Sequence, residues 1–468
     1  MRKRVAIVGG GIAGLAAALK VRDLAPPETE IIVYEQSGVL GGKLRTGRLA
    51  GVRVERGAES FLMSAPTGGP SAAARLAARL GLPIVHPAAV PAAVAASAPP
   101  SGGPARHPAP GSRAEPPLSP LPAGTLMGIP RESPEVPTAD PLLAPGADIS
   151  VGDLVSARLG PEVVDRLVDP LLGGVYAGRA SDLSLATTIP ALAAAARSAH
   201  TLSEAVRAAQ AASKRAPGTP VFGAVDGGMT QLVAAVAAAC GARISLGLPV
   251  RELAPAATGW RLRLGPVPAT QTDDVDAVVL AVPARAAARL LDGVDPIAAA
   301  TVGRLDYASV ALAGFALPPG TTLPVLSGFL VPPSRGTLVK AATFLTRKWT
   351  HLTGEDGPVI VRASLGRYGE EARLQPDDRT LLATAHAELA ELIGAPLPEP
   401  AEAWVQRWGG GLPQYAPGHL DRVAAVRAAI AGRPSLALAG AAYDGVGIPA
   451  CVASGEAAAE TVCKTLED

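Results

Sequence analysis

The chain has 468 residues, of which 48% are hydrophobic and 18% charged, so it is long enough for two or three domains with a large core. Its 42 basic and 41 acidic residues leave a net charge of +1, which argues against a globally basic surface for nucleic acid. Three cysteines are too few for a disulfide framework or a four-ligand zinc site. The six histidines show no metal-binding spacing, so we expect no metal.

The amino terminus has some features of a secretory signal peptide, because basic residues at 2–4 precede an apolar run over 5–19. Four of those fifteen positions are glycine, however, and no clear cleavage site follows. No other stretch offers eighteen apolar residues without charge. We therefore expect a soluble, cytoplasmic protein and leave peripheral contact with a membrane open.

The first thirty-five residues predict a βαβ unit. Residues 5–8 form a short apolar run typical of a buried parallel strand, residues 12–24 predict a helix, and residues 30–35 predict a second strand. Such an opening is typical of an α/β fold.

A glycine-rich loop joins the first predicted strand to the helix. It fits the pattern G-x-G-x-x-G and consists of Gly9, Gly10, Gly11, Ile12, Ala13 and Gly14. Glycines there let a pyrophosphate approach the backbone N–H groups, and the helix amino terminus adds partial positive charge. Glu35 closes the second strand, where a carboxylate can accept hydrogen bonds from ribose hydroxyls. Because Gln36 follows rather than arginine, a 2′-phosphate is disfavoured.

A second glycine pair, Gly41 and Gly42, follows the acidic residue and precedes Lys43. In this context the pair extends the phosphate cradle and favours permanently held FAD over exchangeable NAD. Lys43 is a candidate phosphate ligand, although a solvated lysine is the alternative.

The remainder of the chain predicts further helices and strands. Helices are expected over 71–80, 191–212, 228–239, 379–393 and 454–466, and strands over 243–246, 259–264, 276–281, 337–344, 359–364 and 436–439. Another helical region opens at Ser150, with one apolar face made of Leu154, Leu159, Val163, Leu167 and Leu171. Residues 87–122 contain eleven prolines, so we expect an irregular or mobile segment at least over 95–119.

Several motifs carry a resemblance to a known family. Residues 5–46 resemble the flavin-containing superfamily of amine oxidases, carotenoid desaturases and porphyrinogen oxidases. Segments 56–62, 170–178, 183–185, 407–408, 412–415, 418–420 and 440–451 narrow this to the oxygen-dependent porphyrinogen oxidases of haem biosynthesis. The resemblance spans essentially the whole chain and is strongest to enzymes of monoderm bacteria that act on coproporphyrinogen III. The protoporphyrinogen IX oxidases are the alternative.

The resemblance implies a Rossmann-like FAD-binding domain of the glutathione-reductase and amine-oxidase type, α/β in class. It would be discontinuous, over residues 1–75, 217–290 and 405–468. A connection with the Pro/Ala-rich segment (76–144), a helical domain (145–216) and a substrate-binding domain with a mixed sheet, α+β in character (291–404), would complete the chain.

The resemblance also implies positions for the cofactor. Residues along the flavin edge would be Gly57, Ala58, Glu59 and Ser60. Val250 would contact the adenine through its backbone, and Trp408 would lie near the cofactor. The loop over the isoalloxazine would include Gly440, Val446, Gly447 and Ile448, with the last helix directing its amino terminus at the flavin.

The implied reaction removes six electrons and six hydrogens from a porphyrinogen in three rounds of two-electron transfer to FAD. Each round ends with reoxidation by O₂ and release of hydrogen peroxide. We expect no catalytic triad and identify no side-chain general base, because the flavin N5 carries the chemistry.

Candidates for holding the substrate are a few cations and pocket-lining residues. They are Arg179, Lys340, Arg347, Lys348 and Arg367 for the propionates, and Gly174 and Tyr176 for the pocket wall. Relatives can carry a propionate-binding arginine in the connection, where this chain offers Arg106 and Arg113.

Two rival functions stay open besides protoporphyrinogen IX oxidation. An FAD amine oxidase or carotenoid desaturase is one, although 3% aromatic residues make an aromatic cage harder to build. A non-catalytic porphyrin- or FAD-binding partner of ferrochelatase is the other, and a transient ferrochelatase contact also fits an enzyme.

Overall fold

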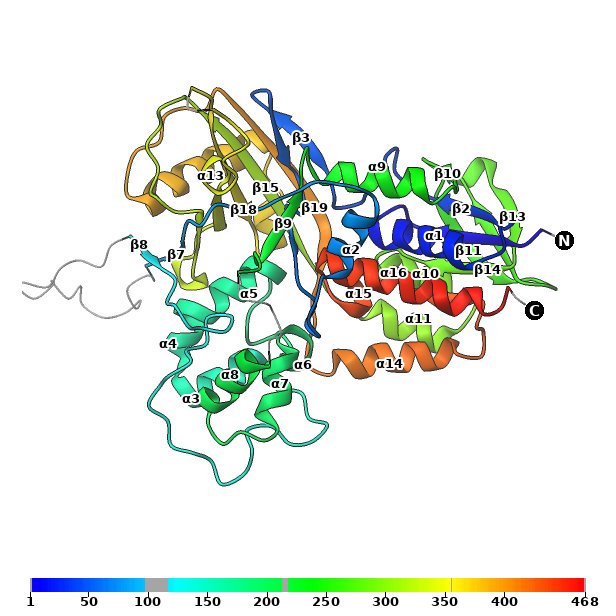
Figure 1. The fold of residues 1–468 in the computed structure, drawn as a ribbon, viewed down its shortest axis with the longest axis horizontal. Helices are drawn as coiled ribbons and strands as arrows, with labels where there is room; N and C mark the ends of the chain where they lie inside the picture. Colours follow the sequence, from blue (N-terminus) through cyan, green and yellow to red (C-terminus); the bar gives the residue numbers. More distant parts are fainter. Residues whose placement is uncertain (1, 97–116, 213–217, 355, 467–468) are drawn as a thin grey trace, which may run out of the picture.

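A five-stranded parallel sheet is the centre of one half of the computed structural model, which describes residues 2–96, 117–212, 218–354 and 356–466 (Figure 1). Its strands, in spatial order, are β10 (Arg243–Ser245), β2 (Glu30–Tyr34), β1 (Arg4–Val8), β14 (Ala277–Leu280) and β20 (Leu436–Leu438). They come from three separated parts of the sequence, as a discontinuous cofactor domain would require. The domain limits themselves stay a prediction.

Helices cover one face of this sheet and a second sheet covers the other. Val5 and Ile7 of β1 pack with α1 (Ile12–Leu24), α9 (Met229–Ala239) and α16 (Ile448–Cys463). The intervening residues of β1, Ala6 and Val8, belong to a second hydrophobic core on the opposite face of the sheet. That core includes the antiparallel strands β11 (Val250–Pro255), β12 (Trp260–Leu264) and β13 (Gln271–Val275), and helices α10 (Ala284–Leu291), α11 (Pro296–Gly303) and α14 (His419–Ile430). Burial on both faces explains the continuous apolar run of β1.

The other half contains a seven-stranded mixed sheet. Its order is β19 (Glu402–Pro413), β15 (Tyr307–Leu317), β18 (Val359–Leu365), β17 (Val339–Phe344), β16 (Gly328–Leu330), β7 (Ala92–Ala95) and β8 (Leu118–Pro120). Only β16 and β7 pair in parallel, and α13 (Asp378–Ile393) packs against the sheet. The predicted α/β class with a mixed second sheet is therefore confirmed.

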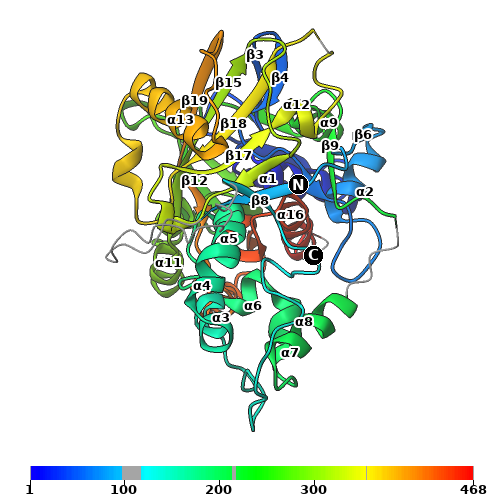
Figure 2. The same ribbon diagram turned by 90° about the vertical axis from the view of Figure 1, so that its left-hand side faces the viewer.

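A group of short helices lies beside both sheets (Figures 1 and 2). They are α3 (Val151–Leu159), α4 (Pro161–Val163), the π-helix η1 (Val164–Val168), α5 (Asp169–Tyr176), α6 (Leu185–Thr188), α7 (Pro190–Ala196) and α8 (Leu202–Ala211). Their common core is largely aliphatic. Ser150 caps α3 by accepting a hydrogen bond from the Asp153 N–H at 2.9 Å, as its sequence predicts.

Smaller elements connect these parts. They are the hairpin β3 (Thr46–Leu49) and β4 (Val52–Glu55), the sheet of β5 (Phe61–Leu62), β9 (Phe222–Val225) and β6 (Ile84–Val85), helices α2 (Ala72–Arg79), α12 (Leu345–Lys348) and α15 (Ala441–Asp444), and the 3₁₀ turns η2 (Val267–Ala269), η3 (Pro333–Arg335) and η4 (Glu371–Leu374). No helix of the described ranges is both long enough and apolar enough to cross a bilayer.

Three predictions about elements are wrong. The last helix begins at Ile448 and not at residue 454, because Gly447 and Pro449 open the helix rather than extending a turn. Residues 191–212 form two helices, with a break between α7 and α8. The ends of the Pro-rich segment are ordered, since Ala95 pairs with Leu118 in the β7–β8 ladder.

The apolar face predicted after Ser150 is confirmed only at its start, where Leu154 lies in the core. Leu159, Val163, Leu167 and Leu171 are only partly buried, while Val155, Val168 and Leu172 occupy the core. Gly160 and Pro161 interrupt the helix, and the π-turn shifts the register of the residues that follow. Arg106 and Arg113 lie outside the described residues.

Candidate cofactor site and active site

The first glycine loop lies between β1 and α1, as predicted. Gly9 donates its N–H to the Tyr34 carbonyl at 2.8 Å. A Cβ on Gly14 would lie 2.0 Å from the Gly9 carbonyl oxygen, whereas a Cβ on Gly11 would meet no protein atom within 4 Å. Gly14 is therefore needed for packing inside the loop. Gly11 instead leaves an open face beside the backbone, which is the close-approach surface that a pyrophosphate needs.

Glu35 follows β2 and turns back onto the glycine loop. Its carboxylate accepts hydrogen bonds from the Gly10 N–H at 2.8 Å and the Ser37 N–H at 2.7 Å. A carboxylate offers about four lone-pair sites, so these two bonds leave acceptors for ribose hydroxyls. Gln36, the next residue, is exposed.

The second glycine pair contacts the first. Gly41 donates its N–H to the Gly10 carbonyl at 2.8 Å, and a Cβ on Gly42 would approach the Gly11 Cα at 3.5 Å. Burial lowers the pKa of the neighbouring Lys43 ammonium, so an anionic ligand beside it would favour the charged form. The two loops thus form one cradle.

Residues 56–58 cross this cradle next to an indole ring. The Trp408 Nε1–H donates to the Arg56 carbonyl at 2.7 Å, and the Ala58 N–H donates to the Lys43 carbonyl at 3.0 Å. A Cβ on Gly57 would lie 2.0 Å from the Lys43 carbonyl oxygen, so only glycine fits there. Sequence-distant segments thereby bring Trp408 and residues 57–60 together, as the resemblance implies.

The carboxy-terminal loop reaches the same place. Gly440 has φ +117° and lies beside Ala13, and it donates its N–H to the Ser454 hydroxyl at 2.9 Å. Gly447 is the N-cap of α16 and Ile448 is its first, buried residue. Neither α1 nor α16 has a side-chain cap, so both helices keep N–H groups available for an acceptor.

Val250 begins β11 close to the acidic end of β2. The Leu248 N–H donates to the Glu35 carbonyl at 3.0 Å, two residues before Val250. The residues predicted for the adenine, ribose, pyrophosphate and flavin ends thus follow one another along the molecule, and the open face at Gly11 and the two uncapped helices fit FAD. The individual contacts with FAD stay predictions.

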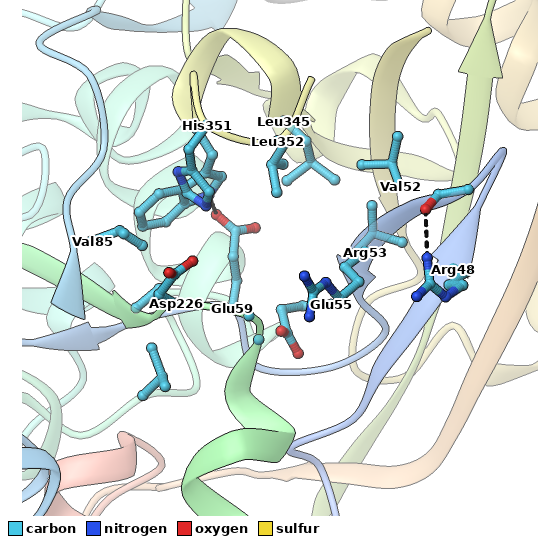
Figure 3. Close-up of a pocket in the computed structure, with 17 residues that line it drawn as sticks. Arg48, Val52, Arg53, Glu55, Glu59, Val85, Asp226, Leu345, His351 and Leu352 are labelled. Atoms are coloured by element: carbon cyan, nitrogen blue, oxygen red, sulfur yellow. Dashed lines mark hydrogen bonds between the residues drawn. The ribbon is translucent and has the colours of Figure 1, made fainter. Parts of the chain in front are cut away.

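Glu59 has an environment that the sequence did not indicate. Its side chain is 9% exposed and accepts hydrogen bonds from Lys348 Nζ at 2.6 Å, Trp349 Nε1 at 2.7 Å and the Arg362 guanidinium. Burial alone would raise the pKa of Glu59, but Arg362 and Lys348 lower it to about 2. Figure 3 shows Glu59 extending across a cavity toward the side on which His351 lies, with Asp226 beside it.

The substrate candidates do not form one cluster of available cations. Lys348 pairs with Glu59, and Arg347 donates to the Leu323 carbonyl at 3.3 Å. Arg367 is buried and donates to two backbone carbonyls. Arg179 pairs with Glu370 at 3.0 Å but keeps a 42% exposed side chain, so it is the best placed of these candidates to meet a propionate.

Lys340 is buried against α5. Its Nζ donates to the Gly173 carbonyl at 3.0 Å, and burial, helped by Arg367 and Arg362, lowers its pKa to about 7. It therefore supports the Gly173 and Gly174 backbone from behind rather than standing at the rim of a pocket.

Gly174 and Tyr176 lie on α5. Gly174 is exposed, and a Cβ there would lie 3.0 Å from the terminal methyl of Leu330 of β16, so a larger residue would require the Leu330 side chain to shift slightly. The Tyr176 ring packs edge-on against Tyr415 with centroids 5.8 Å apart, and burial raises its pKa to about 12. Tyr176 thus stays neutral and apolar in character over the physiological range.

Other residues of the site were missed in the sequence. Arg362 and Trp349 carried no local signal that distinguished them, and Tyr415 lies in the segment 412–415 of the resemblance but was not assigned to the site. A small apolar cluster of Ala177, Ala308 and Val310 packs near Trp408, where α5 meets β15 and β19. The Ser454-Gly455 pair was the one available hint, because small residues in a helix permit close helix packing, and a Cβ on Gly455 would lie 2.1 Å from the Ala13 carbonyl.

Comparison with known proteins gives concordant results. The model of the family described as flavin containing amine oxidoreductase matches residues 12–463. Coproporphyrinogen III oxidase of Mycobacterium tuberculosis is 36% identical over 481 residues, covering 98% of this chain and 97% of the relative. Protoporphyrinogen oxidase of Bos taurus is 27% identical over 501 residues, covering 99% of both. A crystal structure from Exiguobacterium sp. 255-15, assigned as a protoporphyrinogen oxidase, has a TM-score of 0.80 with 28% identity and 99% coverage of both chains.

Proposed function

Because this chain belongs to the flavin-containing amine oxidoreductase family, we propose that it is the FAD-dependent oxidase that converts coproporphyrinogen III to coproporphyrin III in haem biosynthesis. The observation that carries the choice of substrate is the full-length relative of 36% identity, which is named coproporphyrinogen III oxidase. Relatives from Mycobacterium leprae and Bacillus subtilis carry the same name at 35% and 28% identity.

The overall reaction is coproporphyrinogen III plus three O₂ giving coproporphyrin III plus three H₂O₂. Six electrons and six hydrogens leave the macrocycle, and each O₂ accepts two of each. Bound FAD supplies the two-electron acceptor between substrate and oxygen. The chain's own residues bind, orient and exclude water.

Separate groups would share these tasks. The backbone around Gly11 and Gly42 would hold the pyrophosphate, and the Glu35 carboxylate would hold the ribose. The uncapped amino terminus of α16 would direct N–H groups at the flavin ring, where negative charge develops on reduction. On the other side, exposed Gly174 would let the flat macrocycle approach α5, and Arg179 would meet a propionate at the opening.

Steady-state kinetics with both porphyrinogens tests this function. Purified protein should be yellow, and porphyrin fluorescence should show kcat/KM at least about tenfold higher for coproporphyrinogen III than for protoporphyrinogen IX. Oxygen uptake and peroxide release should each be three per porphyrin formed. A higher kcat/KM for protoporphyrinogen IX would assign the alternative substrate.

Two of the similar proteins support protoporphyrinogen IX as the alternative substrate. The crystal structure with TM-score 0.80 is assigned to a protoporphyrinogen oxidase, and the bovine enzyme of that name aligns over the full chain. Yellow protein that leaves both porphyrinogens unoxidised in air would instead indicate a non-catalytic binder.

A cytoplasmic location, transient contact with ferrochelatase and peripheral contact with a membrane stay predictions.

A further inference from the structure

The backbone that would lie along the flavin edge is held from both ends by one arginine of the seven-stranded sheet. Arg362 of β18 donates through Nη1 to the Glu55 carbonyl at 3.0 Å and through Nη2 to the Glu59 carboxylate. Between these ends, the carbonyl of residue 56 and the N–H of residue 58 also have partners, Trp408 and Lys43. Residues 55–59 therefore form a fixed segment whose position is set by the substrate sheet.

The same segment carries an unbalanced buried charge. Glu59 is ionised at neutral pH, because its pKa is lowered to about 2 by its cationic partners. Two cations, Lys348 and Arg362, face this one carboxylate, with side chains only 23% and 12% exposed. The cluster of Glu59, Lys348 and Arg362 thus has a net charge of +1.

Other titratable groups near the cluster do not cancel this charge. Burial raises the pKa of Glu55 to about 7, so its carboxyl is partly protonated at neutral pH. Glu55 is directed away from the cluster, since one oxygen accepts from the Met229 N–H at 2.8 Å and from the Thr46 hydroxyl at 2.9 Å. Asp226 and His351 line the adjoining cavity but are exposed, so solvent screens them.

We propose that the cluster of Glu59, Lys348 and Arg362 raises the reduction potential of the bound flavin, in addition to fixing the segment beside it. The proposal rests on the proposed placement of the flavin along residues 57–60. Two-electron reduction adds negative charge to the ring system, and a fixed net positive charge in a poorly solvated place stabilises that charge. Arg362 and Lys348 are positioning and tuning residues in this scheme, since neither touches the reacting atoms.

Charge-changing variants test the proposal through the sign of the effect. Glu59→Gln raises the net charge to +2 and should shift the flavin redox equilibrium toward the reduced form by about tenfold, which is about 30 mV for a two-electron couple. Lys348→Gln lowers the net charge to zero and should shift it about tenfold the other way. The double variant restores +1 and should return close to the wild-type potential.

Spectroelectrochemical titration of the purified holoenzyme measures these potentials directly. Lys20→Gln is a control, because it removes one charge from a pair between α1 and α16 in which the Lys20 and Glu460 side chains are 29% and 54% exposed. If Glu59→Gln does not retain flavin, Lys348→Gln and the double variant still define the sign. Potentials that move in the same direction, or no further than in the control, would overturn the tuning role.

The experiments distinguish a failure of the tuning role from a failure of the proposed function. A wild-type protein that binds FAD and oxidises coproporphyrinogen III, but whose variants show unshifted potentials, would overturn the tuning role alone. A protein that never binds FAD would overturn both.

Discussion

Replacing Gly11 by alanine should weaken FAD binding without weakening the fold. Gly11 has φ −74° and ψ 174°, which alanine adopts freely, and its Cβ would meet no protein atom within 4 Å. A glycine-to-alanine change at a compatible position raises the free energy of unfolding by about 0.4–1 kcal/mol. The added methyl would, however, occupy the face that the pyrophosphate approaches. Overpacking costs about 1–3 kcal/mol, so FAD should bind on the order of thirtyfold more weakly.

Two measurements on the same preparation separate these effects. Urea denaturation of FAD-free protein gives the free energy of unfolding, and titration of that protein with FAD, followed by flavin fluorescence, gives Kd. Gly14→Ala is the matched control, because its Cβ would lie 2.0 Å from the Gly9 carbonyl oxygen. The control should lose about 1–3 kcal/mol of stability even without cofactor.

Either of two results would refute the reasoning. Unchanged FAD affinity in Gly11→Ala would mean that this face of the loop does not meet the pyrophosphate. A loss of FAD-free stability as large as that of Gly14→Ala would mean that the space beside Gly11 is not open in the folded protein.

For two further substitutions, the structure determines whether the free energy of unfolding rises or falls. Gly455→Ala should lower the free energy of unfolding by about 1–2 kcal/mol, because its Cβ would lie 2.1 Å from the Ala13 carbonyl oxygen. The higher helix propensity of alanine offsets only part of that clash. A variant that proves more stable in thermal denaturation would contradict the close packing. Lys340→Met should stabilise the protein by about 2–4 kcal/mol at pH 6 and by progressively less toward pH 10. The reason is that the pKa of Lys340 is lowered to about 7, so the unfolded chain binds the extra proton between pH 7 and about 10, and wild-type stability rises with pH across that window. Urea midpoints at both pH values check this, and a difference independent of pH would show that the buried ammonium is not its source.

The parts of the fold that could be predicted from sequence depend on short-range signals. The limits of α1 match the prediction, because a glycine loop before it and the proline pair Pro26-Pro27 after it both lie next to the helix. The start of α16 was misplaced, since Gly445, Gly447 and Pro449 are typical of a turn as well as of a helix opening. The π-turn of η1 has no such signature, and it changed which side chains of the following helix face the core.

Within the candidate site, contacts between residues that are distant in sequence could not be predicted, because short-range signals do not report them. The glycine cradle and Glu35 lie within a few tens of residues, so pattern and spacing placed them together. Arg362, by contrast, is 303 residues from Glu59, and nothing local distinguishes it from other arginines of a strand. The sequence indicated Lys348 only as a candidate propionate ligand, whereas the structure pairs it with Glu59.

The close packing of α16 on α1 has a consequence for how the protein is made. More than four hundred residues separate β1 from β20, the edge strand of the same sheet. At synthesis rates of about 5–20 residues per second, the nascent chain exposes the apolar side of α1 on the order of 20–90 s before α16 exists to cover it. The cofactor cradle is therefore completed only after α16 has been synthesised, and until then the apolar side of α1 stays exposed to contacts with other chains.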